Sequence, residues 1–314
     1  MRALVLGGCG FIGSHLVDAL QVAGHTVSVF DRAGERYRHP VPGVDYMVGD
    51  FADKMALAEA LSGKDVVFHL VSTTFPGTAN MDPKADVTGN LISTLNLIEM
   101  MNSIGIRRLV YLSSGGTVYG PTPSHPIPED HPMNPISSYG IVKVAIERYL
   151  EMFRASHGLQ PISIRAANPF GPRQGHTGVQ GVISTFMRRM RDGQRIEIWG
   201  TGHVVRDYLY VSDLAALCVA AAESDLCGAV NAGSGEGRSL LELIDALANV
   251  SGQVIVPDFM PSRKIDVPYS VLDIAKAREM LCWQPVIDFR DGLRTTWHWI
   301  HKPDRSAKAL SVFE

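Results

Sequence analysis

A glycine-rich turn near the start of the chain restricts its possible folds more than any other stretch. Residues 2–6 form a short apolar run that suits a buried parallel strand, and residues 14–20 carry apolar side chains at helical spacing. Between them, the glycines of residues 7–13 fit two registers, one from Gly7 and one from Gly8. A strand, a glycine turn and a helix in this order let the backbone approach a pyrophosphate at the helix N-terminus. A plain tight βα turn has the same pattern.

The second strand decides between these two interpretations. Residues 26–30 form an apolar run that ends at Asp31, which follows Gly13 by 18 residues. In dinucleotide-binding folds an acid about 20 residues after the glycine motif binds the adenosine ribose hydroxyls. We therefore predict a dinucleotide site. Because Asp31 would repel a 2′-phosphate, we predict NAD as the cofactor, and the nearby Arg32 and Arg36 leave NADP open.

Strands and helices alternate along the first half of the chain. Further apolar runs predict strands at 44–49, 65–71 and 107–112, and helical periodicity predicts helices at 52–61 and 83–102. This alternation, with the glycine turn in its first unit, favours an α/β fold built on a parallel, doubly wound sheet.

Polar residues follow two of these strands. Asp50 could meet an adenine amino group or cap the helix at 52–61, and the two interpretations carry equal weight. Ser72, Thr73 and Thr74 follow the strand at 65–71 and are expected in the crevice at the strand ends, where ligands bind in such sheets.

A tyrosine and a lysine four residues apart are the candidates for catalysis. Tyr139 and Lys143 share one face of a helix that Ser137 or Ser138 can cap. This spacing alone is common by chance. Because it follows a dinucleotide motif and the serine-rich strand end at 113–114, we predict that the pair is functional.

Bulk properties exclude several classes of protein. The 314 residues suffice for one large α/β domain with an elaboration or for two domains, and the net charge of −3 predicts no nucleic-acid or membrane partner. The four cysteines are scattered without a C-x-x-C pair, and the chain starts on a core strand, which leaves no room for a signal peptide. We therefore expect reduced thiols, a cytoplasmic location and no metal site.

Together these motifs resemble those of the extended short-chain dehydrogenases/reductases. The resemblance is to the NAD-dependent nucleotide-sugar epimerase/dehydratase branch, which includes UDP-glucose/galactose 4-epimerases, and it extends to about Trp283. The matching stretches are 7–13, Asp31, Asp50, 139–143, 165–173, 206–213, 263–266 and 273–277.

The resemblance implies a domain organisation and an assembly. A Rossmann-type NAD-binding domain would occupy residues 1–168, and residues 169–314 would mainly form a smaller lobe that binds the nucleotide sugar, with part returning to the large sheet. Helices near residues 87–103 and 138–155 would pair in a four-helix bundle between two copies of the chain, which predicts a homodimer.

The resemblance also implies which residues bind each ligand. Cofactor-binding residues would be Gly7, Gly10, Phe11, Ile12, Gly13, Asp31, Arg32, Asp50, Phe51, Leu70, Val71, Ser72, Tyr139, Lys143 and Pro169. Substrate-binding residues would be Thr74, Asn168, Arg206, Arg263, Asp266 and Ser270. Of these, Arg206 and Arg263 would hold the diphosphate of a UDP-sugar, because guanidinium groups suit phosphate oxygens.

The chemistry of the predicted pair agrees with the family's reaction. A tyrosine with a pKa of about 10 is a poor base at neutral pH. Lys143 and the positive nicotinamide would favour the Tyr139 phenolate, which could take a proton from a sugar hydroxyl while a hydride leaves the same carbon for NAD⁺.

The chain departs from the family pattern after the strand at 107–112. Many relatives carry a catalytic serine or threonine where this chain has Gly115. Ser114, Thr117, a water or a substrate group could replace that donor, and we favour Thr117 as a catalytic residue beside Tyr139. Its alternative role is packing near a strand end.

The same stretch discriminates between reactions. Related dehydratases carry an Asp-Glu pair where this chain has Gly116 and Thr117, so elimination lacks its acid and base here, whereas epimerisation needs only one tyrosine. We predict a UDP-sugar 4-epimerase. A dehydratase or a 4-keto reductase of the same family and a non-enzymatic NAD-binding sensor are the alternatives. Ser270 lies at a family gate position where a small residue admits an N-acetyl group, so UDP-N-acetylhexosamines are expected substrates as well as UDP-hexoses.

Overall fold

The computed structural model describes residues 1–75, 77–175, 181–262 and 267–302. Residues 303–314, the C-terminal tail of the sequence, therefore lie outside the described residues. No helix in the described ranges is both long enough and apolar enough to cross a membrane.

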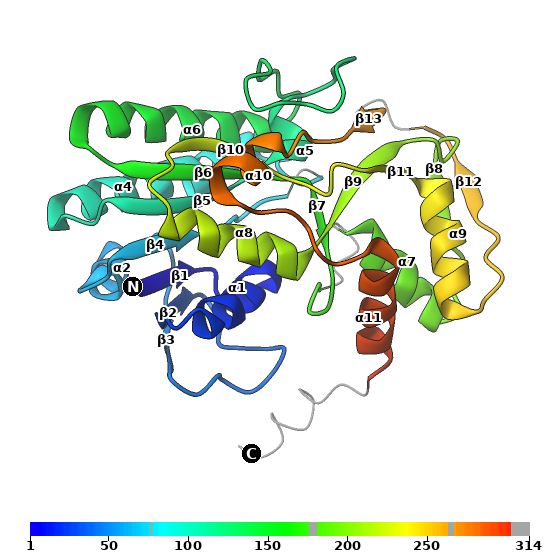
Figure 1. Ribbon diagram of the computed structural model, residues 1–314, viewed down its shortest axis with the longest axis horizontal. Helices are drawn as coiled ribbons and strands as arrows, with labels where there is room; N and C mark the ends of the chain where they lie inside the picture. Colours follow the sequence, from blue (N-terminus) through cyan, green and yellow to red (C-terminus); the bar gives the residue numbers. More distant parts are fainter. Residues whose placement is uncertain (76, 176–180, 263–266, 303–314) are drawn as a thin grey trace.

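Seven parallel strands form the main sheet, in the order β10-β6-β5-β4-β1-β2-β3 (Figure 1). This order reverses between β1 and β4, which makes the crevice at their carboxyl ends the expected ligand site. The predicted α/β doubly wound fold is confirmed. The strands are β1 (Arg2–Leu6), β2 (Thr26–Asp31), β3 (Val44–Val48), β4 (Val66–His69), β5 (Arg108–Ser114), β6 (Gln160–Ala166) and β10 (Gly228–Ala232).

Helices cover both faces of this sheet. Figure 1 shows α4 and α6 side by side over one face, and α1 and α8 over the other. The elements that connect or cover the strands are α1 (Phe11–Val22), α2 (Lys54–Leu61), α3 (Pro83–Asp86), the π-helix η1 (Val87–Ile92), α4 (Ser93–Ile104), α5 (Gly115–Val118), α6 (Ser138–His157), α8 (Val211–Glu223) and α10 (Ala275–Leu281).

Alternation along the strands divides the core into two layers. In β1, Ala3 and Val5 pack with α1 and α8, whereas Leu4 and Leu6 pack with α2, α4 and α6. Successive side chains of a strand point to opposite faces, so a parallel strand covered on both sides needs apolar residues throughout. The near-continuous apolar run of β1 is the local signal of that burial.

A second lobe contains the remaining elements. Its core lies between α7, α9 and α11 and includes Phe170, Phe186, Met187 and Leu293. The elements are β7 (Asn168–Phe170), α7 (Val182–Arg191), β8 (Glu197–Trp199), β9 (Val205–Tyr210), β11 (Gly237–Ser239), α9 (Leu240–Ser251), β12 (Asp258–Met260), β13 (Tyr269–Ser270) and α11 (Phe289–His301). The division at residues 168 and 169 remains a prediction.

The structure differs from the sequence prediction in two local features. The continuous helix expected at 83–102 is interrupted by η1, a π-helical segment that periodicity cannot reveal. Asp50 does not cap α2; the cap is Asp53, whose carboxylate accepts hydrogen bonds from the N–H groups of Met55 and Ala56. Asp50 instead accepts one from Ala52 at 2.8 Å.

Candidate functional site

The glycine turn is as tight as the predicted phosphate site requires. A Cβ on Gly13 would overlap the carbonyl oxygen of Gly7, and Gly7 itself has a φ of 83°, which favours glycine. α1 begins at Phe11, and the residue before it, Gly10, has no side chain that could cap the helix. The N–H groups of its first turn, including those of Phe11, Ile12 and Gly13, lack intrahelical acceptors and suit an anionic ligand.

The acid at the end of β2 lies against this turn. One carboxylate oxygen of Asp31 accepts a hydrogen bond from the Cys9 N–H at 3.0 Å. The interaction holds Asp31 beside the glycine turn. Arg32 and Asp50 are both exposed, on the segments that follow β2 and β3. This donor and acceptor set fits a dinucleotide whose adenosine ribose carries free hydroxyls.

The segment after β4 closes the other side of the turn. A Cβ on Gly7 would lie 3.4 Å from the backbone of Leu70 and of Val71, so these residues pack directly on the glycine turn. The Ser72 hydroxyl donates to the Thr74 carbonyl oxygen at 2.9 Å. Phe51 is buried with its ring 4.9 Å from that of His69, so its side chain belongs to the core beneath this segment.

Tyr139 and Lys143 come together in the first turns of α6, as their spacing predicts. Ser137 caps the helix by accepting a hydrogen bond from the Gly140 N–H. The Lys143 ammonium lies 5.5 Å from the centre of the Tyr139 ring and donates to the Leu112 carbonyl oxygen at 2.8 Å. The catalytic candidates therefore face the end of β5.

Burial has the largest effect on the pKa values of Tyr139 and Lys143. It lowers the pKa of Lys143 to about 8, although the nearby Glu147 and Asp86 oppose this change. Burial also raises the pKa of Tyr139 to about 12; the Asp86 carboxylate acts in the same direction, and a hydrogen bond with Ser72 opposes it. In the protein by itself, the phenol is therefore the favoured form of Tyr139.

A buried ion pair that no motif in the sequence indicates lies close to Lys143. Glu147 lies one turn after Lys143 on α6, and its carboxylate accepts hydrogen bonds from Arg165 on β6, the shortest at 2.7 Å. It also accepts one from the Ser113 hydroxyl. The 139, 143, 147 spacing in the sequence is the signal that could have revealed Glu147.

The structure explains the missing hydroxyl at position 115. A Cβ on Gly115 would lie 2.5 Å from Leu272 and 2.9 Å from the carbonyl oxygen of Arg165, so this position is closed to a side chain. The neighbouring Ser114 ends β5. The Thr117 hydroxyl is buried and has no hydrogen-bond partner among the described residues, which leaves it able to bind a ligand.

Three predicted substrate residues lie on neighbouring strands of the second lobe. Asn168 lies on β7, the strand that pairs with β9. Its side-chain amide donates a hydrogen bond to the Asp207 carbonyl oxygen at 2.9 Å. Ser270 on β13 is buried and pairs in register with Arg206 on β9. The Arg206 guanidinium donates to the Val267 carbonyl oxygen at 2.6 Å. Arg206 and Ser270 are therefore neighbours in space, 64 positions apart in sequence.

Two of the remaining predicted site residues already form hydrogen bonds within the protein, and two are not described. Pro169 follows Asn168 in β7, and its carbonyl oxygen accepts a hydrogen bond from Gln174. The Thr74 hydroxyl donates to Asp86 at 2.7 Å, so toward a substrate it could act only as an acceptor. Arg263 and Asp266 lie outside the described residues.

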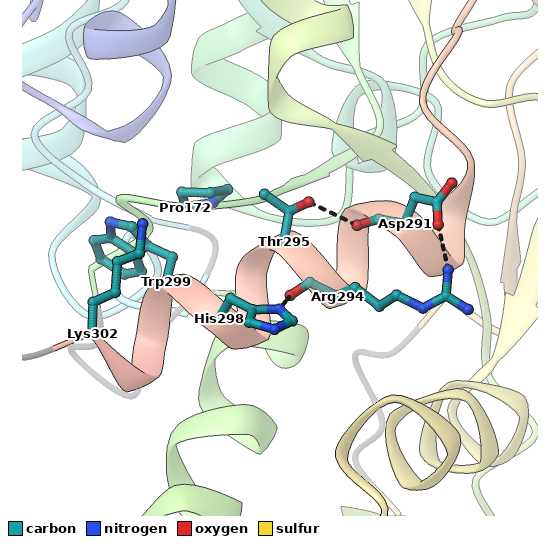
Figure 2. A pocket seen from close by; sticks show the side chains of 7 residues that line it. All are labelled: Pro172, Asp291, Arg294, Thr295, His298, Trp299 and Lys302. Carbon is teal, nitrogen blue, oxygen red and sulfur yellow. Dashed lines mark hydrogen bonds and ion pairs between the residues drawn. The ribbon is translucent and has the colours of Figure 1, made fainter.

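A surface cavity of about 560 Å³ lies away from the predicted site residues. Figure 2 shows that one side of α11 forms it, together with Pro172. None of its seven lining residues is a predicted cofactor or substrate residue. The candidate site is therefore recognised by its chemistry and not by the size of a cavity.

Comparison with known proteins identifies the family. A family model described as the NAD dependent epimerase/dehydratase family matches residues 3–233. The chain belongs to this family. Its use of NAD, predicted from Asp31, is thereby confirmed.

Individual relatives span almost the whole chain. A UDP-glucose 4-epimerase of Mycolicibacterium smegmatis is 37% identical over 304 residues, which cover 94% of this chain and 97% of the relative. The crystal structure of the UDP-glucose 4-epimerase of Thermotoga maritima with UDP-glucose has a TM-score of 0.92 and 35% identity, covering 96% of this chain and 99% of that one. The UDP-glucose 4-epimerase of Thermus thermophilus, in complex with NAD, has a TM-score of 0.89 and 34% identity, with the same coverage.

Proposed function

We propose that this NAD-dependent enzyme inverts C4 of a UDP-hexose or a UDP-N-acetylhexosamine through a transient 4-keto sugar. The observation that carries the proposal is the Tyr139–Lys143 pair at the end of β5, in a site with no acid at Gly116 or Thr117. One acid/base group suits epimerisation, whereas elimination of water needs two more. The names of the M. smegmatis and T. maritima relatives agree with this reaction.

The proposed mechanism assigns a role to each of these residues. NAD, when bound, would supply the hydride acceptor at C4 and later the hydride donor. Tyr139 would take the proton from the C4 hydroxyl and return it after the keto sugar has turned over. Lys143 would hold a positive charge beside the phenol and bind the nicotinamide ribose. Arg206, with Arg263, would hold the diphosphate, so that the sugar stays free to turn.

Product analysis tests this function. The protein is incubated with NAD and, separately, with UDP-glucose and UDP-N-acetylglucosamine, and the products are identified by NMR. We expect axial C4 epimers without loss of water. A 4-keto-6-deoxy sugar would instead identify a dehydratase. No product from either sugar and no transient NADH absorbance would favour the NAD-binding sensor.

Thr117 is proposed as the donor that replaces the missing hydroxyl at position 115. Thr117→Val keeps the shape of the side chain but removes its buried hydroxyl, and we expect kcat to fall roughly 10-fold or more. Ser114→Ala, at the neighbouring hydroxyl, is the matched comparison and should keep most of the activity. Steady-state kinetics at saturating UDP-sugar measures both. A larger loss in Ser114→Ala would move the donor role to that residue.

Ser270 is proposed to determine which sugars fit. It is buried next to Arg206, so a bulkier side chain must enter the space beside the proposed diphosphate site. We expect Ser270→Tyr to lose kcat/KM on UDP-N-acetylglucosamine by at least 10-fold more than on UDP-glucose. Ser270→Ala should keep the ratio of the two values. Equal losses on both sugars in Ser270→Tyr would contradict this role.

A homodimer remains our proposal for the assembly. Ile92, Ile141, Tyr149 and Met152 are large apolar side chains exposed on η1 and α6, next to α4. Ile141, Tyr149 and Met152 share one face of α6 by their helical spacing, and exposed apolar side chains on one face are typical of a protein interface. Measurement of the molecular mass in solution tests the dimer.

The cytoplasmic location of the protein also remains a prediction.

A further inference from the structure

A buried carboxylate lies beside the proposed base and has no role in the mechanism above. Asp86, the last residue of α3, is fully buried. Its two oxygens accept three hydrogen bonds from side chains. The donors are Thr74 at 2.7 Å, Asn90 at 2.8 Å and Ser138 at 2.6 Å. Three donors at these distances are the partners expected of a buried, ionised carboxylate.

The three donors belong to three separate segments. Thr74 lies in the segment after β4, Asn90 lies in η1, and Ser138 is the first residue of α6 and the direct neighbour of Tyr139. Asp86 therefore ties the start of the catalytic helix to the strand-end segment.

The π-helix completes the arrangement. The Asn90 side chain also accepts a hydrogen bond from the Thr73 N–H at 2.8 Å. A Cβ on Gly89 would lie 2.7 Å from the Thr73 hydroxyl, so a side chain at position 89 would displace that hydroxyl. π-helical turns are frequent at functional sites, because the extra residue redirects the side chains around it. Here η1 directs Asn90 at the segment that Asp86 also binds.

We propose that Asp86 is a positioning residue for Tyr139. Its hydrogen bonds hold the start of α6 in place, and its negative charge opposes loss of the phenolic proton. The proposal rests on the proposed role of Tyr139 as the base. Under it, the charge of Lys143 alone does not ionise the phenol, which gives up its proton only when a second positive charge lies near it, as oxidised NAD would supply and reduced NAD would not. Tyr139 would then be a phenolate base when the sugar is oxidised and a phenol acid when the keto sugar is reduced.

The charges around the phenol agree with this role. The Tyr139 phenol is faced by Lys143 from α6, Tyr111 from β5, Ser72 from the segment after β4, and Asp86. Asp86 is the carboxylate that raises the pKa of Tyr139, in addition to the larger effect of burial. Removal of its charge should therefore lower the pH at which the phenol ionises.

The test measures ionisation of Tyr139 without any turnover. Tyrosines are labelled with ¹³C at Cζ in the NAD⁺-loaded protein, and the Tyr139 signal is assigned from its absence in Tyr139→Phe. Between pH 6 and 10 we expect Asp86→Asn to shift the titration of this signal to lower pH by roughly half a pH unit or more. Asp82→Asn, an exposed acid that caps the same short helix, should titrate like the parent protein. No difference between Asp86→Asn and the parent would overturn the electrostatic role.

A second variant tests the positioning role separately. Ser138→Ala removes one hydrogen bond to Asp86 and keeps its charge, so kcat should fall roughly 10-fold with the Tyr139 titration unchanged. An unchanged kcat in Ser138→Ala would overturn the positioning role. This test remains valid even if Asp86→Asn fails to fold. If the parent protein epimerises neither sugar, the proposed function fails, but the NMR titration still decides the charge effect.

Discussion

Tyr139→Phe is expected to lower kcat for the UDP-sugar by roughly 10²–10⁴-fold, the range that general acid–base catalysis contributes. The variant keeps the aromatic ring and loses only the group that takes and returns the proton. The glycine turn, Asp31 and Lys143 stay unchanged, so NAD should remain bound. Turnover is measured by coupled assay and NAD content by release on denaturation.

A neighbouring tyrosine supplies the control. Tyr149 lies on the same helix and is 38% exposed, whereas Tyr139 lies beside the buried Lys143. Tyr149→Phe should therefore keep full activity. Activity of Tyr139→Phe close to that of the parent protein would contradict the assigned base. Loss of NAD together with activity would instead give Tyr139 a binding role.

Glu147→Gln is expected to lower the free energy of unfolding by about 3–5 kcal/mol, because it leaves the Arg165 guanidinium buried without its counter-charge. Glu147 and Arg165 are 5% and 4% exposed, and the guanidinium approaches the carboxylate at 2.7 Å. Burial of an unpaired charge is far more costly than loss of a solvated one. Chemical denaturation measures the change.

The same helix offers a matched comparison one turn later. Glu151 forms an ion pair with Arg154 at 2.9 Å, but the two side chains are 41% and 51% exposed. Such pairs contribute about 0–1 kcal/mol. Glu151→Gln makes the same chemical change as Glu147→Gln and should have little effect on stability. Equal losses in the two variants would mean that burial of the Glu147–Arg165 pair does not determine its contribution.

Local patterns predicted much of the site. The glycine turn, Asp31 and the Tyr139–Lys143 pair were recognised because each depends on a spacing of a few residues or on one βαβ unit. Steric limits on backbone conformation and the helical repeat act over such distances. The parallel sheet followed from alternation of apolar strands and helices.

Other features depend on residues from distant parts of the chain. Gly115 is closed to a side chain by Leu272, 157 positions later. The Asp86 cluster joins three segments, and the neighbouring η1 interrupts a helix whose apolar repeat is regular. The contacts of Gly115 with Leu272 and of Asp86 with Thr74 and Ser138 join residues far apart in the sequence, so no local pattern encodes them.

The sequence by itself thus determined the type of fold, the cofactor and the choice of Tyr139 and Lys143 as the proposed catalytic pair, since these depend on local sterics and periodicity. Only the tertiary structure decided how the pair is buried and which charges surround it: Asp86 beside Tyr139, and Glu147 with Arg165 behind Lys143. Desolvation and Coulomb interactions are set by distances in space, and those distances exist only after the chain has folded.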